Sequence, residues 1–125
     1  MPIDATQPYD DQNIFAKILR GELPCTKVYE DEWAFAFHDI NPQAPIHILV
    51  VPKGRYVSWD DFTEKGSDAE ISGFIRAVGK IARDQGLVAP GYRLIANTGF
   101  HSHQEVPHFH VHICAGKQMG RMIPE

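Results

Sequence analysis

The segment PHFHVHICAG, residues 107–116, alternates histidine with apolar residues and limits the possible folds of this chain more than any other stretch. Successive side chains of a β-strand point to opposite faces, and the strand rises about 3.3 Å per residue. His108, His110 and His112 would therefore share one face at steps of about 6.6 Å. The pattern predicts a strand that packs one apolar face on a core and presents three imidazoles on the other.

A metal site and a catalytic site are competing explanations for these histidines. Zinc binds histidine nitrogens at about 2.0–2.1 Å, which brings the liganding atoms within about 3.5 Å of one another. The first and third histidines of such a strand lie roughly 13 Å apart at the backbone, so all three could reach one ion only across a bulge. His101 and His103 keep a metal site open, because five of the seven histidines fall between residues 101 and 112. We predict no metal and no other cofactor.

A row of imidazoles suits catalysis on phosphorus better than metal binding. Neutral imidazole, with a pKa of about 6.5, is a nucleophile and a proton carrier at physiological pH. One ring could attack a phosphoryl centre while its neighbours hold the transferred group and orient the nucleophile. The chain has neither the P-loop pattern G-x-x-x-x-G-K-[ST] nor an aspartate-rich metal cluster. Imidazolium and backbone N–H groups would then have to meet the phosphate charge, and residues 99–105 are the expected place for those N–H groups.

Hydrophobic periodicity in the rest of the chain predicts an α+β domain. Ser67 and Glu70 have the spacing of a capping box, and apolar residues continue from there at helical period until Gly86. Asp11 is expected to cap a short helix that stops at Gly21. Aromatic and β-branched runs predict five mostly antiparallel strands, at residues 26–30, 33–40, 46–52, 92–99 and 107–115.

Size and charge argue against several kinds of function. The 125 residues suffice for one domain, residues 1–125, with 1–10 as a flexible lead-in and 116–125 as a C-terminal tail. A formal net charge of −4 argues against nucleic acid as a partner, and no stretch approaches the roughly 20 apolar residues of a membrane span. Cys25 and Cys114 lack C-x-x-C spacing, as expected for reduced thiols. We expect a cytoplasmic protein that has neither nucleic acid nor membrane as a partner.

The motifs HDINPQAPIH, QEVPHFHVH and HFHVHIC make the chain resemble the histidine triad (HIT) superfamily, in particular its Hint branch of nucleoside phosphoramidate hydrolases. The resemblance extends over roughly residues 13–122. It implies a HIT-like fold, with a five-stranded antiparallel sheet, one long and one short helix in each subunit, and a homodimer that joins two sheets. The implied activity is metal-free hydrolysis of adenosine or guanosine 5'-phosphoramidates, so the expected ligands are purine nucleoside monophosphate derivatives.

The resemblance also assigns roles to individual residues. His110 would attack the α-phosphorus and form a nucleotidylated histidine that water then cleaves. His112 would contact the phosphate and assist the departing amine, while His108 and His47 would complete a relay behind the nucleophile. Asp39 would accept hydrogen bonds from the ribose hydroxyls. The purine slot would be lined by Ile14, Phe15, Ile18, Phe37, His38 and Ile40, and the phosphate-side loop would contribute Asn97, Gln104, Glu105 and Val106.

Simpler explanations exist for some of these residues. Core packing accounts equally well for the apolar ones, a turn cap for Asp39, and a hydrogen-bonded strand histidine for His47. The chain also departs from many Hint proteins, which have glycines at the positions of Ser102 and His103. A side chain at His103 would restrict the approach of the backbone to a phosphate, and Glu105 adds a negative charge nearby.

Two other functions compete with the phosphoramidate hydrolase. One is hydrolysis of dinucleoside polyphosphates, as in the Fhit branch of the same superfamily. The other is a nucleotide-sensing or protein-binding module in which hydrolysis is incidental. Comparing cleavage of dinucleoside polyphosphates and phosphoramidates distinguishes the first from the phosphoramidate hydrolase. Ligand affinity in a catalytically inactive variant distinguishes the second.

Overall fold

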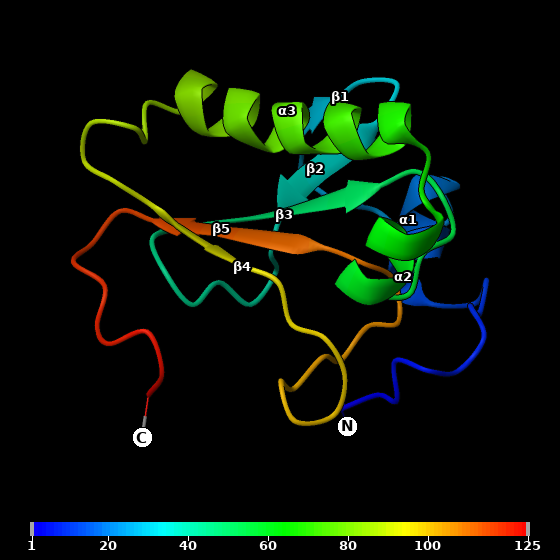
Figure 1. Ribbon diagram of the computed structural model, residues 1–125. Coiled ribbons are helices and arrows are strands. Elements are labelled where there is room, and N and C mark those ends of the chain that lie inside the picture. Colours follow the sequence, from blue (N-terminus) through cyan, green and yellow to red (C-terminus); the bar gives the residue numbers. More distant parts are fainter. Residues whose placement is uncertain (1, 125) are drawn as a thin grey trace.

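The computed structural model describes residues 2–124, and its centre is one antiparallel sheet of five strands. The strands are β1 (Lys27–Glu30), β2 (Ala34–His38), β3 (Ile46–Pro52), β4 (Arg93–Ile95) and β5 (Val111–Ala115), and the helices are α1 (Ile14–Leu19), α2 (Trp59–Lys65) and α3 (Asp68–Asp84). The strand order β1-β2-β3-β5-β4 puts the histidine-bearing strands β3 and β5 side by side (Figure 1). This architecture confirms the expected α+β class and the five-stranded antiparallel sheet.

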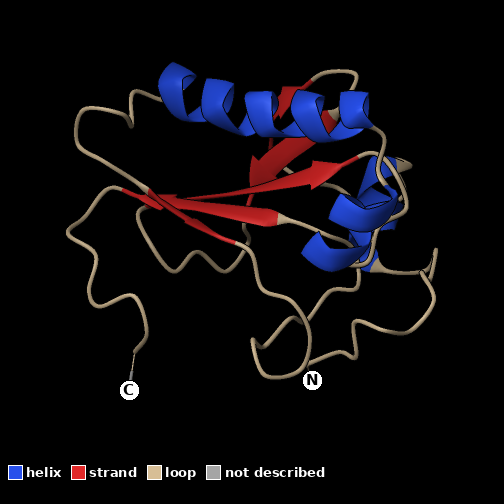
Figure 2. Ribbon diagram, viewed as in Figure 1, coloured by secondary structure: helices blue, strands red, loops and turns tan. Residues whose placement is uncertain are grey.

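Helix α3 covers one face of the sheet, as Figure 2 shows. The expected capping box begins it: the Ser67 hydroxyl accepts the N–H of Glu70, and the Glu70 carboxylate accepts the N–H of Ser67. Phe74 of α3 is fully buried in one cluster with Ile48 of β3 and Ile113 of β5. In the part of the chain that the structure describes, no helix is long and apolar enough to cross a membrane.

The histidine segment shows the expected alternation, although only part of it is strand. Phe109, Val111 and Ile113 belong to the core under α3, and the histidines between them lie toward the other face. Strand β5 begins only at Val111, so the predicted strand 107–115 is too long. Its first part leaves the ladder because the N–H of Phe109 donates to the carbonyl of Tyr56, which lies outside the sheet.

The second face of the sheet carries α1 and a smaller apolar cluster. Phe15 of α1 packs there with Phe37 of β2 and Leu49 of β3. The cap of α1 is Asn13, whose side-chain oxygen accepts the N–H of the residue three positions later. The prediction of Asp11 as the cap is therefore wrong. Asn13 directly precedes the first helical residue, and this is the position from which a capping side chain reaches the N–H.

Several element boundaries differ from the sequence expectations. The hydrophobic pattern does not predict α2, because Phe62 is its only buried residue and gives no helical period. Strand β4 keeps three residues of the expected 92–99, and the chain after Ile95 leaves the sheet as a loop. Strand β2 ends at His38, two residues before the expected end at residue 40.

Both end segments of the chain contact the domain. The N–H of Ile3 donates to the carbonyl of Gln104 at 2.8 Å, within the segment expected as a flexible lead-in. The Arg93 guanidinium donates to the carbonyls of Gly120 at 2.8 Å and Arg121 at 3.4 Å, which holds the C-terminal tail beside β4. Both ends lie on the side of the sheet away from α3 (Figure 1).

Candidate active site

A cavity of about 560 Å³ lies on the sheet face that carries α1. Its walls come from α1, the segment before β1, the end of β2 with the loop after it, and the histidine segment. Apolar side chains therefore stand beside three imidazoles and two carboxylates. The size falls within the range of about 300–1,000 Å³ that is usual for small-molecule sites.

Most of the residues assigned from the resemblance meet in this cavity. It is lined by Ile14, Phe15, Ile18, Phe37, His38, Asp39, Ile40, Glu105, Val106, His110 and His112. Four assigned residues are outside its lining. His47, His108 and Gln104 are buried, and Asn97 is half-buried in the loop after β4.

His110 is held with one ring nitrogen free. Its Nδ1 lies 2.7 Å from the carbonyl oxygen of His108, and because a carbonyl only accepts, Nδ1 carries the proton and donates. Nε2 then keeps its lone pair, and no hydrogen bond to it is seen within residues 2–124. The Phe15 ring stands perpendicular to the imidazole at a centroid distance of 4.9 Å and restricts its rotation. An unprotonated Nε2 on a cavity-lining ring has the lone pair that nucleophilic attack requires.

The side chain of His108 points away from the cavity. Its Nε2 lies 2.9 Å from the carbonyl oxygen of Pro52, so Nε2 carries the proton. Its Nδ1 lies 2.6 Å from the Tyr9 hydroxyl, which must therefore donate. His108 reaches His110 only through its backbone carbonyl. Of the row of three imidazoles that the alternation predicts, the His108 ring therefore does not reach the cavity, because it is 1% exposed and both its nitrogens are bonded elsewhere.

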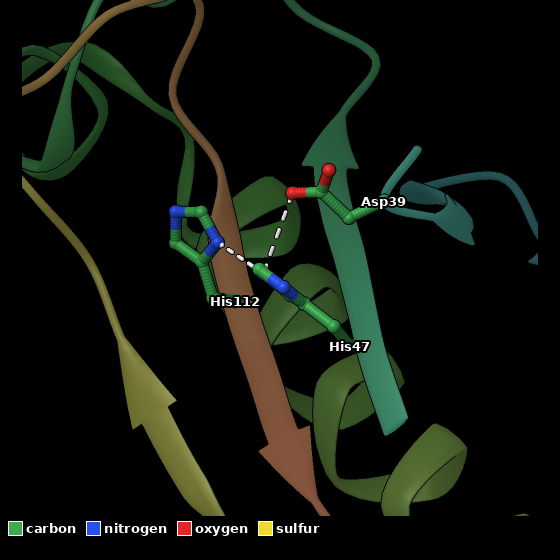
Figure 3. A group of neighbouring side chains, drawn as sticks. All are labelled: Asp39, His47 and His112. Atoms are coloured by element: carbon green, nitrogen blue, oxygen red, sulfur yellow. Dashed lines mark hydrogen bonds and ion pairs between the residues drawn. The ribbon is translucent and has the colours of Figure 1, made fainter. Parts of the chain in front are cut away.

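His47 and His112 form a second pair, which Figure 3 shows together with Asp39. The backbone N–H of Gln43 donates to Nδ1 of His47 at 3.0 Å, so the proton of the His47 ring is on Nε2. That Nε2–H donates to Nδ1 of His112 at 2.9 Å, with the Asp39 carboxylate 3.4 Å away. Nδ1 of His112 is consequently the acceptor, and its Nε2–H is left to donate. The expected relay is thus divided: His47 bonds to His112, and His108 bonds to His110.

Burial lowers the pKa of all three histidines of the motif. For His108 burial lowers the pKa from 6.5 to about 4. For His112 burial, followed by the neighbouring His110 and His47, lowers the pKa from 6.5 to about 4. Burial also lowers the pKa of His110, although its hydrogen bond to His108 and the charge of Asp39 act to raise it. With a lowered pKa, the three rings are neutral at physiological pH. A neutral ring is the nucleophilic form of histidine.

Asp39, His47 and His112 are also close enough to be considered as a metal site. One ligand atom from each lies within 4.8 Å of the others. An ion bound to Nε2 of His47 would force the ring proton onto Nδ1. There the proton would face the N–H of Gln43, so two donors would oppose each other. The observed hydrogen bonds therefore favour a proton-carrying pair over a metal site.

Residues 99–105 form a loop that is held from inside by Gln104. Its side-chain oxygen accepts the N–H of Gly99 at 2.9 Å, and its side-chain nitrogen donates to the carbonyls of Val57 at 2.7 Å and Val106 at 3.1 Å. These bonds engage the amide that was expected to meet the phosphate. His103 has a φ of 61°, a left-handed conformation that glycine adopts at lower cost.

Sequence reasoning did not identify several residues that shape the site. Tyr9 and Pro52 determine the tautomer of His108, and Gln43 determines that of His47. Pro52 and Gln43 act through backbone groups, which leave no signal in residue type. Tyr9 acts across 99 residues of chain, and periodicity describes only neighbouring residues. Leu23, Pro24, Cys25, Asn41, Gln43 and Leu49 line the cavity as well.

Comparison with known proteins agrees with this fold. A family model described as HIT domain matches residues 20–119, most of the chain. The chain belongs to the HIT family. An HIT-like protein of Azospirillum brasilense is 59% identical over 115 residues, which cover 92% of this chain and 94% of that protein.

Two further HIT relatives carry names that describe an activity. The purine nucleoside phosphoramidase of Escherichia coli K12 is 41% identical over 113 residues, covering 90% of this chain and 94% of that enzyme. The crystal structure of an HIT family hydrolase from Legionella pneumophila superposes with a TM-score of 0.79 at 39% identity, covering 86% of this chain and 95% of that one. HIT relatives of this chain thus include hydrolases, and the fold is the HIT fold.

Proposed function

We propose that this HIT protein hydrolyses purine nucleoside 5'-phosphoramidates through a nucleotide that is transiently bound to His110. One observation carries the proposal: the His108 carbonyl fixes the His110 proton on Nδ1 and leaves the Nε2 lone pair free in a cavity of about 560 Å³. The name of the relative from Escherichia coli supports the class of substrate. No step requires a metal ion.

The tautomers define the order of bond changes. Nε2 of His110 attacks the α-phosphorus, forming a nitrogen–phosphorus bond as the bond from phosphorus to the substrate amine breaks. The departing amine takes up one proton from the solvent in the cavity. The ring bound to phosphorus becomes cationic, and the His108 carbonyl accepting its Nδ1–H stabilises that charge. Water then cleaves the intermediate, the nucleoside monophosphate leaves, and the proton returns to solvent.

His112 would bind the phosphoryl group in this reaction. Because His47 donates to Nδ1 of His112, the Nε2–H of His112 is available to donate to a phosphoryl oxygen. The ring centroids of His112 and His110 are 5.0 Å apart, so one phosphoryl group can contact both. Preorganised donors of this kind stabilise charge that develops in a transition state.

The apolar part of the cavity would hold the base. Phe15 and Phe37 form its buried inner part, and Ile14 and Ile40 are 50% and 89% exposed at its edge. A bound purine would cover this apolar surface, and its burial favours binding. Asp39 accepts the N–H of Asn41 with Oδ1, and its second oxygen can accept from ribose hydroxyls.

We also propose a homodimer that pairs two copies across β4. This strand is an edge of the sheet, and around it lies a second hollow of about 370 Å³ lined mainly by apolar residues. Trp59, Ile75 and Leu94 line it and are 47%, 47% and 49% exposed. An exposed apolar strand edge favours pairing with another chain. Light scattering of the wild type and of Leu94→Asp would test this, since the variant should be monomeric.

The function is tested with adenosine 5'-phosphoramidate. The wild type should release AMP, and intact-mass spectrometry after rapid acid quenching should detect adenylated protein. His110→Ala should lose both, whereas His101→Ala, which removes an exposed histidine outside the cavity, should retain both. Normal AMP release by His110→Ala would reject the proposal.

Two comparisons separate the competing functions. Faster cleavage of diadenosine polyphosphates than of the phosphoramidate would favour the polyphosphate hydrolase. AMP affinity should be measured for His110→Ala by calorimetry. If AMP binds this variant normally and the wild type shows no turnover, the protein is a nucleotide-binding module.

A further inference from the structure

We propose that Tyr9 is a positioning residue for the nucleophile, acting on His110 through the ring and carbonyl of His108. The inference rests on the proposed function and adds to it a residue outside the histidine motif. Tyr9 lies in the segment before α1, far from the motif in sequence, yet its hydroxyl is 2.6 Å from Nδ1 of His108.

The hydrogen bonds around His108 leave one possible partner for Nδ1. The Pro52 carbonyl accepts from Nε2–H at 2.9 Å, so in the neutral ring Nδ1 has a lone pair and needs a donor. The ring is 1% exposed, and water therefore has little access to it. Among the described residues the Tyr9 hydroxyl is the group that donates to it. The ring is thus fixed from both ends, between Tyr9 and Pro52.

The fixed ring determines where the nucleophile stands. The carbonyl of His108, on the same residue as this ring, accepts Nδ1–H of His110 at 2.7 Å. Because the ring is anchored at both nitrogens, it holds the Cα of His108 and so limits movement of the carbonyl that keeps the proton off Nε2 of His110. Phe15 contacts both rings, at centroid distances of 6.5 Å from His108 and 4.9 Å from His110, so movement of one affects the packing of the other.

Tyr9 is itself held in place by several contacts. The Arg55 guanidinium lies over its ring at 5.3 Å from the centroid and pairs with Asp11 at 3.0 Å. The Tyr9 ring also meets the His108 ring edge to face, with centroids 5.5 Å apart. The segment before α1 therefore places the Tyr9 hydroxyl against Nδ1 of His108.

Loss of the hydroxyl has a defined consequence. In Tyr9→Phe the aromatic ring remains, and Nδ1 of His108 loses its donor. The ring can then move its proton to Nδ1, which loses the hydrogen bond from Nε2 to the Pro52 carbonyl, or it can rotate toward water. Either change loosens the acceptor of His110. Because misplacement of a reacting group by about 1 Å can cost roughly 100-fold in rate, we expect about a tenfold loss of kcat.

The experiment compares Tyr9→Phe with Tyr29→Phe. Tyr29 donates its hydroxyl to Asp31 at 2.7 Å on β1, outside the cavity lining, so this control loses the same kind of group without affecting the histidines. Turnover of adenosine 5'-phosphoramidate and the single-turnover rate of protein adenylation are measured for both. Tyr9→Phe should lower kcat and the adenylation rate about tenfold with KM changed less than twofold. Tyr29→Phe should match the wild type.

A spectroscopic readout separates positioning from a loss of fold. Nitrogen-15 NMR of the histidine rings should show the proton of His108 on Nε2 in the wild type and a changed or mixed tautomer in Tyr9→Phe. Arg55→Ala, whose side chain is exposed, provides a second variant should Tyr9→Phe fail to fold. It should lower kcat in the same direction by a smaller factor.

Two outcomes overturn the inference. The first is a folded Tyr9→Phe with wild-type kcat and adenylation rate, and the second is an unchanged His108 tautomer in that variant. If the wild type itself does not turn over the phosphoramidate, the proposed function fails. The tautomer measurement then still decides whether Tyr9 fixes His108.

Discussion

Replacement of Gln104 by alanine should destabilise the protein by about 3 kcal/mol. The side chain is 1% exposed and makes three hydrogen bonds, to Gly99, Val57 and Val106. Each such bond contributes a net of about 1 kcal/mol, and alanine replaces none of them. The variant leaves one N–H and two carbonyls of the backbone without their partner. Because the Val57 carbonyl is buried, leaving it unpaired adds a desolvation cost, so the sum of the three net contributions is the lower bound of the loss.

Urea denaturation followed by tryptophan fluorescence measures this loss. With an m-value of about 1.5 kcal/mol/M, a loss of about 3 kcal/mol lowers the midpoint by about 2 M. Gln118→Ala is the matched control, since Gln118 is an exposed glutamine of the C-terminal tail and its midpoint should not move. The substitution should also loosen the neighbouring Glu105 and Val106, which line the cavity, and so raise KM for the phosphoramidate.

An unchanged urea midpoint for Gln104→Ala would refute this reasoning. If Gln104 contacted the phosphate, as the resemblance implies, Gln104→Ala would keep the midpoint of the wild type and lose affinity for AMP. A midpoint shift below about 0.5 M would mean that the three hydrogen bonds contribute almost nothing to stability. The structural account of the loop would then be wrong.

Two further predictions concern pH and packing. Because the pKa values of His108 and His112 are about 4 in the folded state and about 6.5 when unfolded, the unfolded chain binds more protons between these values. Stability should therefore be constant above pH 6.5 and fall as the pH drops toward 4, by up to about 1.4 kcal/mol per pH unit for each group. Urea midpoints measured from pH 7 to 4 check this. If the midpoint of His112→Asn fell with pH as steeply as that of the wild type, the prediction would be contradicted. Gly73→Ala should lower the midpoint despite the better helix propensity of alanine, because the new Cβ would lie 2.3 Å from the Trp33 ring. A higher thermal midpoint for Gly73→Ala would contradict the predicted clash.

Local patterns in the sequence predict much of the fold. The run Ile46–Pro52 is a strand with the expected bounds, and α3 begins at the capping box of Ser67 and Glu70. Both signals are local: one is a continuous apolar run, and the other joins residues three positions apart. Helix α2 carries no such signal, since its one buried residue, Phe62, shows no period. The strand propensity of residues 107–110 predicts pairing that the contact of Phe109 with Tyr56 prevents.

The resemblance to a known family predicted most of the residues that line the cavity. The six residues of the expected purine slot all line the cavity, and so do Asp39, His110 and His112. Asn97 and Gln104 do not, because the place of a residue in or near a motif does not determine the direction of its side chain. Gln104 turns inward because three backbone groups of its own loop and of the segment before α2 require partners.

The alternation of histidine and apolar residues by itself determined that the motif has a core face and a histidine face, since a strand has a period of two. Only the tertiary structure decided what each imidazole does. A histidine can carry its proton on either nitrogen, and the choice depends on the donor or acceptor that faces each one. Those partners, Tyr9 and Pro52 for His108 and Gln43 for His47, are brought there by the folded chain.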